Sequence, residues 1–148
     1  MINEHFVKAY IEIGSKLGVN VTYLQEEHAE KYVSMVLKKH KPWRNSGHVQ
    51  IATEKKDSIK FSADIFEFTY SEYLPKEPVC IFFDQSDKER NTVIKVEDGR
   101  KVGAMMKLYS LEYFLSNETA DYLIAVNDYV VEYKGNNPEW FDGLEKSF

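Results

Sequence analysis

The chain has 148 residues, of which 43% are hydrophobic and 14% aromatic, and its formal net charge is −5. This composition excludes a disordered chain, and no stretch approaches the roughly 20 consecutive apolar residues that cross a bilayer. Cys80 is the single cysteine, which excludes an intramolecular disulfide framework. We expect one domain over residues 1–148. The N-terminal sequence lacks the basic region and apolar run of a signal peptide, so the expected location is cytoplasmic.

Two helices are predicted at the start of the chain, over residues 3–17 and about 24–40. In the first, Phe6, Tyr10 and Ile13 are spaced four and three residues apart, which places them on one helical face. In the second, glutamates stand near the start and lysines near the end, an order that matches the helix dipole.

From residue 48 the hydrophobic residues alternate with polar ones, which is typical of strands. Strands are predicted over residues 48–53, 59–65, 66–70, 79–83 and 92–96. The first two would be joined by a turn at 55–58, and a bulge near residue 65 would separate the second from the third.

Toward the C-terminus we expect a short helix at about 111–116, in which Leu111, Phe114 and Leu115 face inward. A hairpin over 122–133 follows, with Asn127-Asp128 as its two-residue turn. A proline at the first helical position predicts a terminal helix near 137–144. The predicted fold is α+β: two N-terminal helices, an antiparallel sheet of about five to seven strands, one late helix and a C-terminal hairpin.

A search for catalytic and cofactor motifs finds none. The chain has no paired histidines at metalloprotease spacing, no glycine-rich phosphate loop and no dinucleotide fingerprint. Cys80 lies in an apolar run where a thiol is expected to be buried and inert. His40 and His48 flank a polar loop and are expected at the surface. The sequence therefore predicts no catalytic residues, no metal ligands and no cofactor.

The net charge is distributed unevenly along the chain. Residues 1–74 contain ten acidic and ten basic residues, whereas residues 104–148 contain eight acidic and three basic ones and so account for the whole imbalance. Residues 38–60 are locally basic, with seven bases and two acids. Such segregation indicates that the acidic charge is concentrated on one part of the protein surface.

The acidic last third is also rich in aromatic residues, which suit protein interfaces because they combine rigid apolar area with a polar group. In the predicted hairpin, alternation places Tyr129, Val131 and Tyr133 on one face and Val130 and Glu132 on the other. The alternative is that these tyrosines line the edge of the core with their hydroxyl groups in water.

The order of elements over residues 79–134 resembles that of small bacterial immunity proteins of contact-dependent inhibition and polymorphic toxin systems. The resemblance rests on the apolar strand ending in Phe82-Phe83-Asp84, the polar loop and strand after it, the helix capped by Ser110, and the segment 122–131. It implies a cytoplasmic, non-enzymatic protein that occludes a toxin, often a basic nuclease, with acidic and aromatic side chains.

We therefore predict an immunity protein that binds a cognate, basic toxin domain through the acidic aromatic surface. The expected partner-binding residues are Glu112, Asp121, Asp128, Tyr129, Glu132, Tyr133 and Trp140. One alternative is a small metabolic enzyme whose site is assembled from distant residues, such as Cys80 with a histidine. Another is a nucleic-acid-binding module that uses residues 38–60, although the acidic pI of about 5.4 argues against it. No membrane partner is expected.

Overall fold

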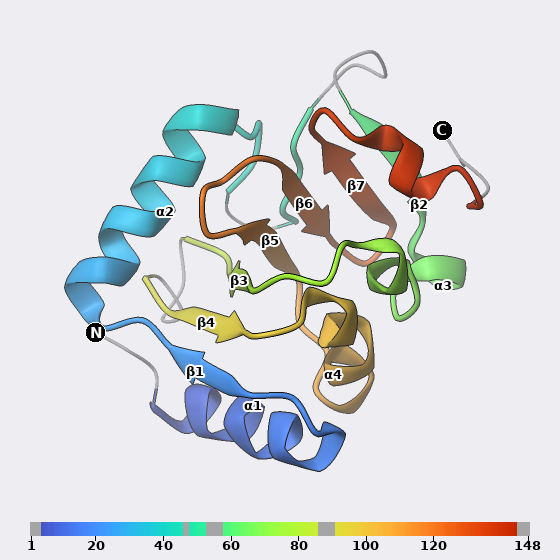
Figure 1. The fold of residues 1–148 in the computed structure, drawn as a ribbon. Coiled ribbons are helices and arrows are strands. Elements are labelled where there is room, and N and C mark those ends of the chain that lie inside the picture. Colours follow the sequence, from blue (N-terminus) through green and yellow to red (C-terminus); the bar gives the residue numbers. More distant parts are fainter. Residues whose placement is uncertain (1–3, 46–47, 53–57, 86–90, 145–148) are drawn as a thin grey trace.

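The centre of the fold is a seven-stranded antiparallel sheet with the strand order β1-β4-β3-β5-β6-β7-β2 (Figure 1). The computed structural model describes residues 4–45, 48–52, 58–85 and 91–144. The strands are β1 (Val21–Tyr23), β2 (Ile59–Ser62), β3 (Val79–Phe82), β4 (Val93–Val96), β5 (Tyr113–Asn117), β6 (Leu123–Val126) and β7 (Val130–Lys134). The α-helices are α1 (Glu4–Leu17), α2 (Glu26–His40), α3 (Ala63–Phe66) and α4 (Val102–Leu108). The 3-10 helices are η2 (Tyr70–Tyr73), η3 (Gly99–Lys101) and η4 (Pro138–Phe141). The α+β class is confirmed.

Both faces of the sheet are covered, because successive side chains of a strand point to opposite faces and both sets are apolar here. On one face, Phe6 and Tyr10 of α1 and Met105 of α4 join a core that contains Ile81 and Ile94. On the other face, α2 packs against the alternate side chains of the same central strands, Cys80 and Phe82 among them. Figure 1 shows α1 alongside β1 at one edge, and α2 and α4 on opposite sides of the central strands.

The strongest sequence patterns correspond to observed elements. The two N-terminal helices, the strands β3 and β4 and the β6–β7 hairpin lie within two residues of their predicted bounds. The terminal segment forms the short 3-10 helix η4 with Pro138 at its start.

Four predictions of local structure are wrong. Residues 113–117 form the strand β5 where a helix was expected, and every residue of β5 is buried. The strand predicted over 59–65 ends at Ser62, and α3 begins in place of the bulge. The segment predicted as the strand 66–70 forms no strand, because Phe66 ends α3, residues 67–69 form a turn and Tyr70 begins η2. Residues 48–52 form a single bridge, Arg44 with Gln50, and no regular strand; the turn predicted at 55–58 lies almost entirely outside the described residues.

His40 is buried at the end of α2, contrary to the surface position expected for it. Its exposed fraction is 6%, and its Nε2 atom lies 2.7 Å from the carbonyl oxygen of Ala120. Burial lowers the pKa of His40 most, and the positive charge of Lys134 lowers it further. The hydrogen bond to the Ala120 carbonyl raises the pKa but does not cancel these effects. The folded protein therefore favours the neutral imidazole.

We expect acid to destabilise the protein through His40. Because its pKa is lower in the folded chain, the unfolded chain takes up the proton first as the pH falls. This contribution to stability is complete above the ordinary histidine pKa of about 6.5 and is lost as the pH decreases through the lower, folded value. Urea denaturation should show that His40→Gln loses less stability than the wild type between about pH 7.5 and about pH 5.5. Equal losses in the two proteins would contradict this assignment.

Candidate functional site at the acidic end of the sheet

Antiparallel pairing brings distant parts of the chain together at one end of the sheet. Tyr113 at the start of β5 pairs with Val126 at the end of β6, and Val126 pairs in turn with Val131 of β7. Ser62 at the end of β2 pairs with Val130. Glu112, the β6–β7 turn and the start of α3 are therefore neighbours, although 65 positions separate Ala63 of α3 from Asp128 of the turn.

The β6–β7 turn is organised by the buried side chain of Asn127. Its Oδ1 atom accepts hydrogen bonds from the backbone N–H groups of Tyr129 at 2.8 Å and Val130 at 2.9 Å. Its Nδ2 atom donates to the carbonyl oxygen of Val49 at 3.0 Å. Hydrogen bonds from a side chain to the neighbouring backbone fix a turn without help from the backbone hydrogen bonds between the strands. Asn127 thereby holds Asp128 and Tyr129 at the surface and ties the turn to the segment that carries His48.

His48 meets the turn and Glu112 directly. Its Nδ1 atom lies 2.7 Å from Oε2 of Glu112, and the His48 and Tyr129 rings contact each other edge to face, with centroids 5.4 Å apart. Glu112 is mostly buried, with 21% of its side chain exposed, whereas Tyr129 is 67% exposed. Three of the residues predicted for partner binding, Glu112, Asp128 and Tyr129, are thus brought together.

Carboxylates crowd this end of the molecule. Partial burial raises the pKa of Glu67, a hydrogen bond from Ser110 opposes that rise, and the negative charges of Asp128, Asp64 and Glu112 add to it. Like charges nearby disfavour ionisation, so these three carboxylates add to the larger effect of burial on Glu67. We call the group Asp64, Ile65, Glu67, Glu112, Asp128 and Tyr129, together with His48, the acidic surface.

Two of the predicted partner-binding residues are corrected by the structure. Glu132 and Tyr133 have exposed fractions of 0% and 2%, so neither side chain is accessible to a partner. The Glu132 carboxylate accepts hydrogen bonds from the backbone of Ile51 at 2.7 Å and Ala52 at 2.9 Å, and from Ser58 Oγ at 2.5 Å. Val131 and Tyr133 share a face in the main core as the alternation predicts, whereas Glu132 on the other face is covered by Ile51, Ala52 and Ser58 and not by solvent.

The remaining two predicted residues lie away from the acidic surface. Asp121 is in the connection between β5 and β6, at the opposite end of those strands. Hydrogen bonds from Asn117 and Thr119 lower the pKa of Asp121. The Nζ atom of Lys39 also forms an ion pair with Oδ1 of Asp121 at 3.9 Å. Trp140 of η4 is half-buried, and its ring contacts that of Tyr122 at a centroid distance of 5.3 Å. Both residues make local contacts, and their role in partner binding stays a prediction.

Sequence reasoning missed three members of the acidic surface. Asp64, Ile65 and Glu67 were read as part of a strand, whereas α3 and its cap carry them. Ile65 is 62% exposed, and the backbone N–H of Ala63 donates to the carbonyl oxygen of Tyr129 at 3.0 Å, so α3 adjoins the hairpin turn. The break in alternation at Ile65-Phe66, interpreted from the sequence as a bulge, was the available signal.

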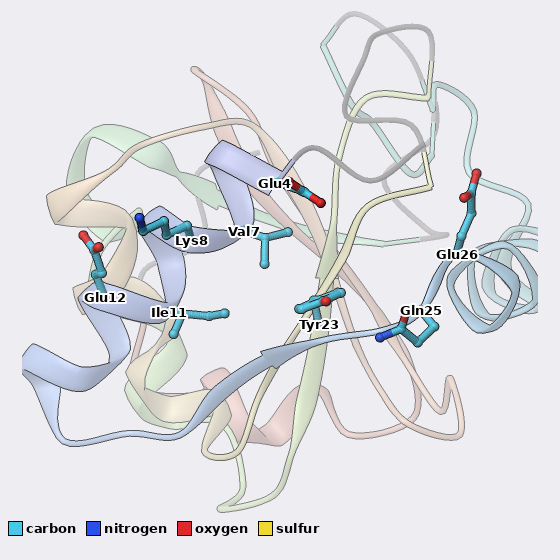
Figure 2. Close-up of a pocket in the computed structure, with 8 residues that line it drawn as sticks. All are labelled: Glu4, Val7, Lys8, Ile11, Glu12, Tyr23, Gln25 and Glu26. Atoms are coloured by element: carbon cyan, nitrogen blue, oxygen red, sulfur yellow. The ribbon is translucent and has the colours of Figure 1, made fainter.

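A separate hollow of about 690 Å³ lies between α1 and β1. Figure 2 shows Val7 and Ile11 of α1 facing Tyr23 of β1 across it, with Glu12 and Lys8 near its rim. Its lining contains neither histidine nor cysteine, so it does not unite Cys80 with a histidine as the enzyme alternative requires. Cys80 itself is buried, and burial raises the pKa of its thiol to about 11, which disfavours the nucleophilic thiolate.

The basic segment 38–60 is partly engaged in internal contacts. Lys39 donates to the carbonyl oxygen of Thr119, and Lys60 to that of Ala52. Trp43 is 52% exposed, but the Arg44 guanidinium stacks over its ring at 4.5 Å. Lys55 and Lys56 lie outside the described residues. Among the described bases of this segment, Lys39, Arg44 and Lys60 are thus engaged within the chain.

Comparisons with family models, with curated proteins and with solved structures found no match. Within the part of the chain that the structure describes, no helix combines the length and the apolar character needed to cross a membrane. The acidic surface is therefore interpreted from its own chemistry.

Proposed function

We propose that the chain is an immunity protein that neutralises a basic toxin domain by binding it through the acidic surface. The observation that carries the proposal is the meeting of four carboxylates with the exposed apolar side chains of Ile65 and Tyr129. Acidic groups steer a basic partner toward the surface, and a rigid aromatic anchor slows its dissociation.

The rigidity of the surface also favours a binding role. The Asn127 hydrogen bonds fix the backbone on either side of Asp128, and the buried Glu132 carboxylate fixes the segment that leads to His48. A surface that is already ordered loses little conformational entropy on binding. Of the residues expected from the sequence, Glu112, Asp128 and Tyr129 remain in the proposed interface.

The test uses the toxin domain encoded by a neighbouring gene, co-expressed with this chain, with survival and association kinetics as readouts. The triple variant Asp64→Lys, Glu67→Lys, Asp128→Lys should associate more slowly, show a weaker dependence on salt and protect cells poorly. The matched control, Glu12→Lys, Glu97→Lys, Asp142→Lys, makes the same change in net charge at exposed positions outside the acidic surface. It should protect nearly as well as the wild type.

Tyr129→Ala tests the anchor separately from the charge. If Tyr129 is a central contact, its loss should cost about 2 kcal/mol of binding free energy, mainly through faster dissociation. Wild-type protection and unchanged rate constants in both the charge-reversed triple variant and Tyr129→Ala would refute the proposed interface.

A further inference from the structure

One ligand atom from each of His48, Glu112 and Asp128 lies within 4.8 Å of the others. The three residues come from the segment after α2, the residue before β5 and the β6–β7 turn. The Nδ1 atom of His48 and Oε2 of Glu112 are already 2.7 Å apart. Donors on one small cation with bonds of about 2.0–2.2 Å stand about 3 to 3.5 Å apart. This pair therefore has nearly the required spacing, and a side-chain rotation of the exposed Asp128 would complete the set.

The other oxygen of Glu112 gives an independent indication of a missing ligand. Oε1 has less than 1 Å² of accessible surface and no hydrogen-bond partner among the described residues. A buried carboxylate oxygen without a partner is costly, because it has given up water and gained nothing in exchange. A bound cation would compensate the charge of the whole carboxylate.

The surroundings also favour a cation over an empty cluster. Glu112 and Asp128 are grouped with two further acidic residues, Asp64 and Glu67, so this end of the sheet is a favourable place for a cation. The hydrogen bonds of Asn127 and Glu132 hold the two segments that supply Asp128 and His48. The donor positions are therefore set by structure outside the cluster, as in sites whose ligands are held by a second layer of contacts.

We propose that His48, Glu112 and Asp128 form a binding site for a divalent transition-metal ion of the Zn²⁺ class. One imidazole nitrogen with two carboxylate oxygens suits Zn²⁺, Co²⁺ or Mn²⁺, whereas Mg²⁺ and Ca²⁺ prefer ligand sets made of oxygen. Three protein ligands leave at least one coordination position for water or for a side chain of a partner. The proposal does not require a toxin partner, since the site is complete in the isolated chain.

The experiment is a titration of the purified chain, free of any affinity tag, with Co²⁺ and then Zn²⁺. We expect a saturable visible absorption from one Co²⁺ per chain, its displacement by Zn²⁺, and a higher melting temperature with Zn²⁺ present. Mg²⁺ in excess should not displace Co²⁺. The variants His48→Gln and Asp128→Asn should each weaken Co²⁺ binding more than about tenfold. Substitution of residues that only hydrogen-bond to metal ligands already costs about that much in affinity.

Matched controls are His28→Gln and Asp142→Asn, which alter an exposed histidine and an exposed aspartate elsewhere in the chain. Both should bind Co²⁺ as the wild type does. Absence of stoichiometric binding would show that His48 and Glu112 form a simple hydrogen bond, and would overturn the site. Unchanged binding in His48→Gln and Asp128→Asn, or displacement of Co²⁺ by Mg²⁺, would overturn it as well. None of these results depends on whether a toxin is bound.

Discussion

Replacement of Glu132 by alanine is expected to lower the free energy of unfolding by at least about 3 kcal/mol. The substitution removes the acceptor for the backbone N–H groups of Ile51 and Ala52 and for Ser58 Oγ, all of them buried. Each buried donor left without a partner costs about 1–3 kcal/mol, and a cavity adds to the loss. Urea denaturation monitored by circular dichroism measures the change.

Glu132→Gln is the informative companion to this variant. Its amide oxygen can still accept one or two of the three hydrogen bonds, but its NH₂ group faces donors in place of an acceptor. We expect an intermediate loss of stability. A loss of stability below about 0.5 kcal/mol for Glu132→Ala would be typical of an exposed position and would contradict the burial of Glu132. The two variants therefore separate a structural carboxylate from a partner-binding one.

Gly103→Ala is expected to destabilise the protein by about 2–3 kcal/mol, although alanine is the better helix former. A Cβ atom at position 103 of α4 would collide with the backbone carbonyl of Phe68 and approach Ser71 Oγ to 2.9 Å. The N–H of Gly103 also donates to that hydroxyl at 2.9 Å. Because backbone cannot move aside as a flexible side chain can, α4 would have to shift away from η2.

Gly143→Ala serves as the control for this prediction. There a Cβ atom would meet the Tyr73 ring at 3.5 Å, an ordinary van der Waals contact. Its effect on the melting temperature should be small. If Gly103→Ala raised the melting temperature, helix propensity would outweigh the contact, and the close packing of α4 on Phe68 would be wrong.

Periodicity in the sequence was sufficient for helices with one buried face and insufficient for the central strand β5. In α1 and α2 one face is exposed, so apolar residues recur at helical spacing. In β5 every residue is buried, because α1 and α4 lie over one face of the sheet and α2 over the other. A short buried run without alternating polarity fits a helix and a strand equally well, and Leu111, Phe114 and Leu115 matched helical spacing by coincidence.

Two further elements had weak local signals. The helix α4 has only seven residues and contains Gly103 in its first turn, which lowers its intrinsic propensity. The strand β1 has three residues and is defined by its pairing with β4. Tertiary contacts, not local preference, stabilise both.

The sequence by itself determined the fold class, the hairpin and the concentration of acid in the last third of the chain. These properties depend on local periodicity, turn chemistry and composition. Only the tertiary structure decided which acids act together. Strand order brings Glu112 and Asp128 to His48 and α3, and it takes Asp121 to the opposite end of β5 and β6. Glu132 is buried against Ile51, Ala52 and Ser58. Sheet pairing and burial join residues far apart in the chain, and no local pattern contains that information.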